Sequence, residues 1–222
     1  ECRWVRLACE RHRQDLERGW ERGLWFDERA ARVAVAFFEK VLRHSKGEWA
    51  GTAVRLEPWQ QFIVGSLVGW KREDGSRRVR TAYVEVPRKN GKTLLAAGLG
   101  LYLMAADGEP GAEVYSAATT REQARLSHGE AVRMVKQSPL LGRELRLFKD
   151  NIHSERSFSK FEPLSSDFNS LDGLNVHGAI CDELHAWRGR ELWDVLETAM
   201  GARRQPLMVA ITTAGSDRQS LC

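Results

Sequence analysis

Gly91, Lys92 and Thr93 stand next to each other and have the residue types that hold a phosphate group. A glycine lets backbone N–H groups close on phosphate oxygens, a lysine reaches the β and γ phosphates, and a threonine hydroxyl ligates Mg²⁺. The usual phosphate-binding loop, G-x-x-x-x-G-K-[ST], begins with a further glycine, but Val86 occupies that place. The triplet alone therefore leaves a second interpretation open, a basic turn before a buried helix.

Asp182 and Glu183 are the second group of residues that could act in catalysis, and they directly follow the short apolar run 178–181. Such a run is typical of a buried parallel strand, so the two acids would lie at the carboxyl edge of a sheet. There Asp182 would hold the same Mg²⁺ as Thr93, and Glu183 would orient the water that attacks the γ phosphate. An ordinary helix start with acids in its first turn is the alternative. Both groups together predict Mg²⁺-dependent ATP hydrolysis.

These side chains need strands and a helix to position them. The β-rich run 79–86 ends at Pro87 and predicts a strand, and the apolar run 94–104 predicts a helix directly after the phosphate loop. A second strand is expected near 112–116 and a third at 178–181. This order of elements predicts an α/β fold, a mainly parallel sheet with helices on both faces.

A further strand is predicted after Gln205-Pro206, where the sequence reads LMVAITT. It is expected beside the strand that ends in Asp182, so that its end could sense the γ phosphate. The residues at this end are Thr212, Thr213, Ala214 and Gly215. A helix is expected over 191–202, and the weak alternation over 152–164 predicts a hairpin or a meander.

Trp59 and Gln60 lie at the start of a helix that Pro58 opens, upstream of the phosphate loop. A glutamine amide both donates and accepts, so it can bind the edge of adenine, and an indole supplies a face for stacking. The alternative is a core tryptophan beside a surface glutamine. A further helix is expected to be capped by Thr119 or Thr120. The alternative there is a loop that senses nucleic acid or a neighbouring subunit, in which Thr120, Arg121 and Gln123 could contact a phosphate backbone.

Residues 1–55 are predicted to form a helical lid or linker, ahead of an ATPase core in residues 56–222. A first amphipathic helix is marked by Val5, Leu7, Ala8 and Leu16, and Asp27 caps a second one. Arginines crowd this segment at positions 3, 6, 11, 13, 18 and 22. They indicate either a solvated helix face or a surface that docks DNA or protein.

Length and composition are those of a globular protein with either one α/β domain and an appendage or two small domains. The chain has 222 residues, of which 42% are hydrophobic and 29% charged. Its apolar runs are shorter than a membrane span, and its start is too charged for a signal peptide, so an intracellular protein is expected. The formal charge of +4 permits a polyanionic partner without requiring one.

Six segments, taken together, resemble the large terminase subunit of tailed bacteriophages, the ATPase and nuclease that packages viral DNA. They lie in the family's order between Leu56 and Gly215: LEPWQQF, VEVPRKNGKT, SAATTREQA, LDGLN, DELHAW and QPLMVAITTAG. In this family the phosphate loop lacks its first glycine and has an arginine three residues before the second, where Arg88 stands. The resemblance thus accounts for Val86.

The resemblance implies a P-loop NTPase of the additional-strand catalytic-glutamate type, with a helical N-terminal lid near the adenine. Catalytic roles fall to Arg88, Lys92 and Glu183, and a coupling role falls to residues 212–215. The implied nucleotide-binding residues are Trp59, Gln60, Arg88, Lys89, Asn90, Gly91, Lys92 and Thr93. Thr93 and Asp182 are the implied Mg²⁺ ligands, and ATP and Mg²⁺ the implied cofactors.

The resemblance also implies partners and a location. Double-stranded DNA, the portal protein and the small terminase subunit are the expected partners, in the cytoplasm of the infected bacterial host and without membrane contact. The chain is expected to be a monomer in isolation and a ring on the portal, where a neighbouring copy supplies an arginine finger. The candidate fingers are Arg121, Arg125, Arg203 and Arg204. The family's RNase H-like nuclease acids cannot be located here, so nuclease activity is not expected.

Two other function classes fit parts of the pattern. A DExH-type helicase has a GKT triplet, a DELH segment and a Thr-Thr strand end in the same order, but it needs a second RecA-like domain, for which the sequence has no room. A nucleotide-binding adaptor that does not hydrolyse ATP is the other class, and the presence of Glu183 argues against it.

Overall fold

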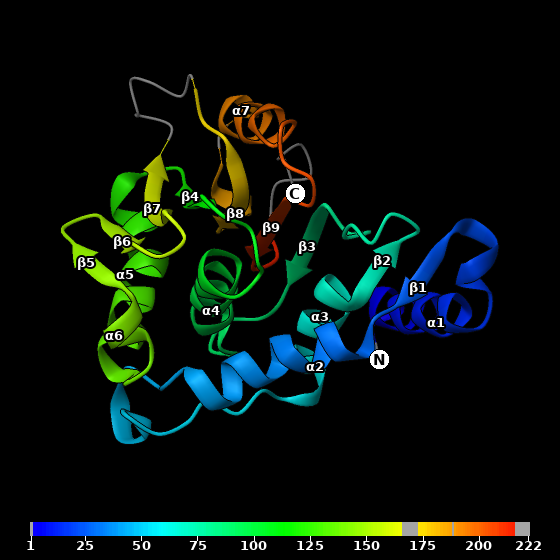
Figure 1. The fold of residues 1–222 in the computed structure, drawn as a ribbon, viewed down its shortest axis with the longest axis horizontal. Coiled ribbons are helices and arrows are strands. Elements are labelled where there is room, and N and C mark those ends of the chain that lie inside the picture. The colour runs from blue at the N-terminus through cyan, green and yellow to red at the C-terminus, as the bar shows by residue number, and fades with distance from the viewer. Residues whose placement is uncertain (1, 166–172, 188, 216–222) are drawn as a thin grey trace.

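The centre of the molecule is a seven-stranded sheet with the strand order β3-β9-β8-β4-β7-β6-β5 (Figure 1). The computed structural model describes residues 2–165, 173–187 and 189–215. The strands are β3 (Thr81–Glu85), β4 (Glu113–Ala118), β5 (Arg146–Phe148), β6 (Asn151–Ser154), β7 (Ser159–Ser165), β8 (Val176–Asp182) and β9 (Leu207–Thr212). The first five strands in this spatial order are parallel, and β6 and β5 continue the sheet antiparallel.

Strand β9 lies between β3 and β8, so the chain places an additional strand between its two site-bearing strands. Tyr83 pairs with Ala210 on one side of β9, and Cys181 pairs with the same residue on the other side. Because these strands are parallel, their carboxyl ends meet at one edge of the sheet. The predicted strand type and the predicted neighbour of the Asp182 strand are both confirmed.

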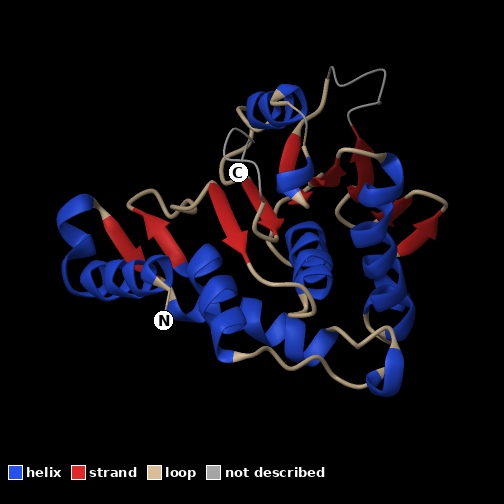
Figure 2. Ribbon diagram, turned by 180° about the vertical axis from the view of Figure 1, so that it is seen from behind, coloured by secondary structure: helices blue, strands red, loops and turns tan. Residues whose placement is uncertain are grey.

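Helices cover both faces of this sheet, as the sequence predicts (Figure 2). Val114, Ile180 and Val209 pack with α4 (Lys92–Ala105) and α5 (Arg121–Gln137) in one buried cluster. Ala179 and Met208 alternate with them and pack with α7 (Glu191–Ala199) in a second cluster. This period of two is what a strand buried on both faces requires.

Two glycines of helix α4 allow aromatic rings to pack against its backbone. A Cβ atom on Gly98 would lie 2.2 Å from the ring of Phe38, and one on Gly100 would lie 2.5 Å from the ring of Phe161. Real Cβ atoms do not approach that closely, so each ring occupies space that only glycine leaves free. The N-terminal segment and strand β7 therefore both pack directly against the backbone of α4.

The N-terminal region consists of short elements around α3 (Pro58–Gly69). They are α1 (Arg3–Arg18), η1 (Gly19–Arg22), β1 (Leu24–Phe26), α2 (Glu28–Ala36), a π-helical turn η2 (Phe37–Val41) and η3 (Gly47–Trp49). Strand β2 (Trp70–Arg72) pairs antiparallel with β1. The Asp27 side chain accepts a hydrogen bond from the backbone of Ala30 at 2.9 Å, which confirms the predicted cap.

Two short elements outside this region complete the description, α6 (Leu141–Glu144) and η4 (Leu184–Ala186). None of the described helices is long and apolar enough to cross a lipid bilayer.

Several sequence-based boundaries differ from the structure. The strand predicted from residue 79 begins at Thr81, and the helix predicted over 191–202 ends at Ala199. The pairing of β1 with β2 was not predicted, because its partners lie far apart in the sequence and each has only three residues. The hairpin β6–β7 agrees with the alternation seen in 152–164. In the LDGLN segment, Leu171 and Asp172 lie outside the described residues.

Helix α1 exists where it was predicted, but its apolar side chains are not buried in this chain. Trp4 is 71% exposed, and Val5 and Leu16 are also exposed. The buried side chain of α1 is Asp15, which pairs with Arg22 and Arg78. An amphipathic pattern predicts a helix correctly here without predicting what covers its apolar face.

Candidate active site

The phosphate loop joins β3 to α4 and runs along the carboxyl edge of the sheet. Lys89 and Gly91 have positive φ angles of 65° and 73°, so the backbone turns sharply at both positions. The Asn90 side chain donates to the carbonyl oxygens of Pro87 (3.3 Å) and Arg88 (3.1 Å) and braces the turn. Lys92 is the first residue of α4. The loop thus ends at a helix N-terminus, which favours a bound anion.

Lys92 and Glu183, which the sequence placed in separate motifs, meet at this edge. The Lys92 ammonium donates to the carbonyl oxygen of Val86 at 3.4 Å and lies 3.8 Å from Oε1 of Glu183. Glu183 has left-handed backbone angles (φ 50°, ψ 48°), which an L-residue adopts at a cost of about 1–2 kcal/mol. Strain of this kind persists where the surrounding structure holds it in place, as at functional sites.

A cavity of about 510 Å³ opens between the phosphate loop and Glu183. Its lining combines the loop with the ends of α5 and β8: Arg88, Lys89, Gly91, Lys92, Thr93, Leu94, Gln123, Glu183, His185 and Ala186. Five of the eight residues predicted to bind nucleotide therefore share one cavity with the predicted catalytic glutamate. Gln123 and His185 also line it, although sequence analysis assigned neither to the nucleotide site.

Asp182 ends β8 and is fixed by three hydrogen bonds. Ser127 donates to its Oδ2 at 2.6 Å, the backbone of Glu183 donates to its Oδ1 at 2.9 Å, and the Trp187 indole donates to its carbonyl oxygen at 3.1 Å. Burial raises the pKa of the Asp182 carboxyl above its ordinary value, against the opposing hydrogen bond from Ser127. Ser127 lies within α5 and carries no sequence signal that would have predicted this contact.

The donor set at this edge fits Mg²⁺. Thr93 presents a hydroxyl in the exposed first turn of α4, and Asp182 presents a carboxylate at the end of β8. Mg²⁺ prefers oxygen ligands and is commonly held by one or two protein groups together with substrate phosphates and water. Thr93 and Asp182 are therefore the residues that would hold the ion.

The end of β9 forms the next wall of the site. Val86 donates its backbone N–H to the carbonyl oxygen of Thr212 at 3.0 Å, and Glu183 donates its own to Ile211 at 3.0 Å. A second cavity of about 570 Å³ lies here, lined by residues 85–88, His185 and residues 213–215. The predicted coupling residues thus lie between the phosphate loop and Glu183.

Gln60 and Trp59 lie behind the phosphate loop. Oε1 of Gln60 accepts from the backbone of Glu57 at 2.9 Å, and its Nε2 faces Gly91, where an added Cβ would lie 3.2 Å away. Gln60 is buried, and Trp59 is half-buried against the cluster that contains α4. The alternative of a surface glutamine is wrong for Gln60.

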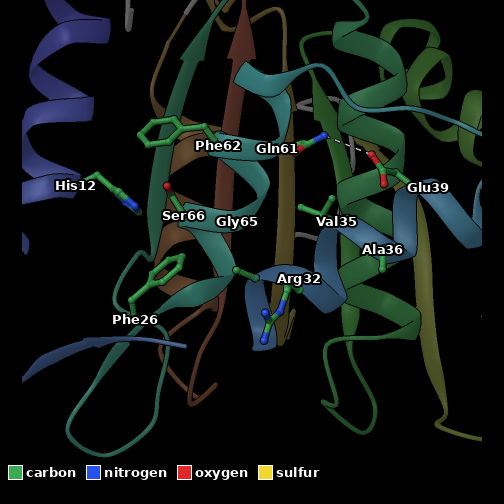
Figure 3. Close-up of a pocket in the computed structure, with 11 residues that line it drawn as sticks. His12, Phe26, Arg32, Val35, Ala36, Glu39, Gln61, Phe62, Gly65 and Ser66 are labelled. Carbon is green, nitrogen blue, oxygen red and sulfur yellow. Dashed lines mark hydrogen bonds between the residues drawn. The ribbon is translucent and has the colours of Figure 1, made fainter. Parts of the chain in front are cut away.

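The outer face of α3 lines a separate pocket of about 330 Å³ (Figure 3). His12 from α1 and Glu39 from η2 face it, and Gln61 donates to Glu39 at 3.4 Å. The neighbouring residues Gln60 and Gln61 thus point to different places, because successive helix positions lie about 100° apart.

The candidate finger arginines fall into two places. Arg121 and Arg125 begin α5 and both bind Asp150, Arg121 at 3.2 Å and Arg125 at 3.0 and 2.8 Å. The cap is Thr120, which accepts from the backbone of Gln123 at 3.3 Å. Arg203 and Arg204 precede β9, at the opposite edge of the sheet from the phosphate loop. There Arg203 donates to Glu109, Pro110, Gly111 and Asn175.

A phosphate loop, an additional strand and an acidic pair on the strand beyond it define a P-loop NTPase of the additional-strand type. The comparison with known families is more specific, because residues 58–222 match the model described as terminase large subunit, ATPase domain. The chain belongs to this family. ATP binding and ATP hydrolysis are the chemistry that such a domain implies.

Individual relatives agree with the family. The large terminase subunit of Enterobacteria phage HK97 is 29% identical over 199 residues, which cover 84% of this chain and 37% of that protein. Protein YmfN of Escherichia coli K12 is 49% identical over 51 residues, 23% of this chain and 11% of its own length. The chain thus spans well under half of the curated relatives that it matches.

Solved structures of large terminases share the fold of this chain. The crystal structure of the HK97 large terminase superposes with a TM-score of 0.74 at 27% identity, over 86% of this chain and 39% of that one. A mutant ATPase domain of the Thermus phage P74-26 large terminase shares the fold, with a TM-score of 0.50 at 20% identity over 63% and 62% of the two chains. These terminase matches give no support to the helicase-like alternative.

Proposed function

We propose that this chain is the ATP-hydrolysing motor of a viral DNA-packaging machine, which uses ATP to move double-stranded DNA into a procapsid. The observation that carries the proposal is the meeting of Lys92 and Glu183 across one cavity, 3.8 Å apart, at the carboxyl edge of the sheet. A phosphate-binding lysine and a water-orienting carboxylate must face each other in this way for hydrolysis.

In the proposed mechanism Lys92 and the N–H groups of the loop bind the β and γ phosphates. Arg88, which lines both cavities, adds positive charge as the γ phosphate separates. Glu183 orients the attacking water and accepts its proton. Thr93 and Asp182 would hold Mg²⁺, which would supply positive charge to neutralise the phosphates. Residues 212–215 then pass the loss of the γ phosphate to the rest of the motor.

The proposed partners follow from the family. They are double-stranded DNA, the portal protein and the small terminase subunit, in the cytoplasm of the infected bacterial cell. We expect a monomer in isolation and a ring on the portal. We expect no nuclease activity from this chain alone, because its adjacent acids Asp182 and Glu183 are already assigned to ATP hydrolysis and a two-metal nuclease needs a further cluster of acids. In this organisation residues 1–55 form the lid, although residues 34–42 already pack into the cluster that contains α4.

The function is tested by phosphate release from ATP. The purified protein should release phosphate from ATP when Mg²⁺ is present. This release should stop when the ion is chelated and should resume when Mg²⁺ is added back. Asp182→Ala should need a higher Mg²⁺ concentration, because one of two protein ligands is missing. No release under any of these conditions would contradict the proposed function.

Adenine selectivity should depend on Gln60. Replacing Gln60 by alanine should narrow the preference for ATP over GTP by about 1–3 kcal/mol, the cost of one unmet polar partner. Competition of GTP with a fluorescent ATP analogue measures the preference, and Gln61→Ala is the matched control because Gln61 faces the other pocket. Equal competition by GTP and ATP in the unchanged protein would contradict an adenine site.

A further inference from the structure

The described part of the chain contains one histidine that touches both the proposed catalytic glutamate and the proposed coupling residues. His185 is the second residue of η4, just past the end of β8. Its Nδ1 lies 3.2 Å from Oε2 of Glu183 and 2.8 Å from the hydroxyl oxygen of Thr212. The Thr213 hydroxyl lies further out, at 3.5 Å from the same nitrogen.

The hydrogen-bond donors at this point can be assigned from the neighbours. The Thr212 hydroxyl donates its only proton to the carbonyl oxygen of Thr213 at 3.0 Å, so towards His185 it can only accept. A glutamate carboxylate also only accepts. We therefore assign the proton of His185 to Nδ1, so that this single N–H is shared between Glu183 and Thr212.

The end of β9 encloses His185 from a second direction. The backbone N–H of His185 donates to the Thr212 hydroxyl at 3.3 Å, and a Cβ atom on Gly215 would lie 3.1 Å from Cβ of His185. The carboxylate of Glu183 is held at its other oxygen by Lys92 at 3.8 Å. Glu183 thus stands between the lysine that binds phosphate and the histidine that contacts β9.

We propose that His185 is a positioning residue that links Glu183 to the end of β9. This inference rests on the proposed function. When a γ phosphate binds Lys92 and the attacking water binds Glu183, the Nδ1–H of His185 donates its hydrogen bond to Thr212 alone. When the phosphate leaves, Glu183 returns to His185 and the contact with Thr212 weakens. The position of the glutamate is thereby transmitted to residues 212–215 without contact between β9 and the nucleotide.

The test compares substitutions that keep or move the donor. An asparagine amide reproduces a donor at the Nδ1 position, whereas a glutamine amide places it where Nε2 lies. His185→Ala and His185→Gln should each lower kcat by about ten- to a hundredfold with little change in KM, because Glu183 loses its orientation. His185→Asn should retain most of the kcat. His153→Ala, on the remote strand β6, is the control and should match the unchanged protein.

Two further measurements separate positioning from a loss of folding. Thr212→Val keeps the shape but not the acceptor, and combining it with His185→Ala should lower kcat no further than His185→Ala alone. Binding of a non-hydrolysable ATP analogue should change amide hydrogen exchange in residues 212–215 of the unchanged protein and of His185→Asn. The same change should be absent in His185→Ala.

Distinct results overturn the inference and the proposed function. If the unchanged protein hydrolyses ATP and His185→Ala has the same kcat, the inference is wrong while the function stands. If His185→Gln retains as much kcat as His185→Asn, the assignment of the donor to Nδ1 is wrong, and the inference is wrong with it. If the unchanged protein neither binds nor hydrolyses ATP, the proposed function itself fails.

Discussion

Replacing Glu183 by glutamine should lower kcat for ATP hydrolysis by about 10²- to 10⁴-fold and leave ATP affinity nearly unchanged. The amide keeps the shape of the side chain but cannot accept the proton of the attacking water. Glu183 lies across the cavity from Lys92, so it contacts the site of reaction and not the main contacts that hold ATP. Phosphate release at saturating ATP measures kcat, and binding of a fluorescent ATP analogue measures affinity.

Lys92→Ala gives the contrasting result for the same two measurements. Lys92 contacts the phosphates both before and during hydrolysis, so its loss should weaken binding and turnover together. Glu197→Gln, on the exposed side of α7, serves as the control and should behave as the unchanged protein. Full turnover in Glu183→Gln would assign the role of Glu183 to another residue.

Full ATPase activity should require a neighbouring copy of the chain. An arginine finger supplied by the next subunit is worth about 10³ to 10⁵ in kcat, so specific activity should climb with protein concentration. Arg121→Ala or Arg125→Ala should abolish this increase if the finger is one of these two residues. Mixing such a variant with Glu183→Gln should restore hydrolysis, because the second subunit supplies the arginine to the intact site of the first.

The structure orders the candidate fingers for this experiment. Arg121 and Arg125 share a single carboxylate, Asp150, and begin the helix whose Gln123 lines the nucleotide cavity. Arg203 already donates to four groups of its own chain, so its substitution should reduce stability more than turnover. Arg143→Ala is a control on the exposed helix α6. If specific activity does not change with protein concentration and no mixture of variants restores hydrolysis, the arginine finger acts within its own subunit, and Arg88 becomes the favoured candidate.

The sequence predicted the sheet well because its central strands are buried on both faces. Continuous apolar runs such as those in β8 and β9 indicate buried strands, and the carboxyl ends of parallel strands must meet at one edge of the sheet. Lys92, Glu183 and Thr212 could therefore be placed together before their geometry was known. The capping positions of Asp27 and Thr120 were predictable because a cap depends on residues only three positions away.

Other features depend on contacts that no local pattern contains. The Ser127–Asp182 and His185–Thr212 hydrogen bonds need the packing of α5 and the neighbourhood of β9 with β8, so no spacing rule predicts them. The exposed face of α1 is a different case. Its pattern correctly indicated a helix, but the partner that would cover Trp4 and Leu16 is not encoded in the helix itself.

The two glycines of α4 have a consequence for the ATPase cycle. Phe38 and Phe161 lie against Gly98 and Gly100 with no space for even a methyl group, so α4 cannot turn or slide without displacing both rings. The phosphate loop leads directly into this helix, so we expect the loop to keep its position on the sheet during the proposed ATPase cycle. We therefore expect motion in the proposed cycle at the opposite wall, where His185 lies 2.8 Å from the Thr212 hydroxyl and 3.2 Å from Glu183.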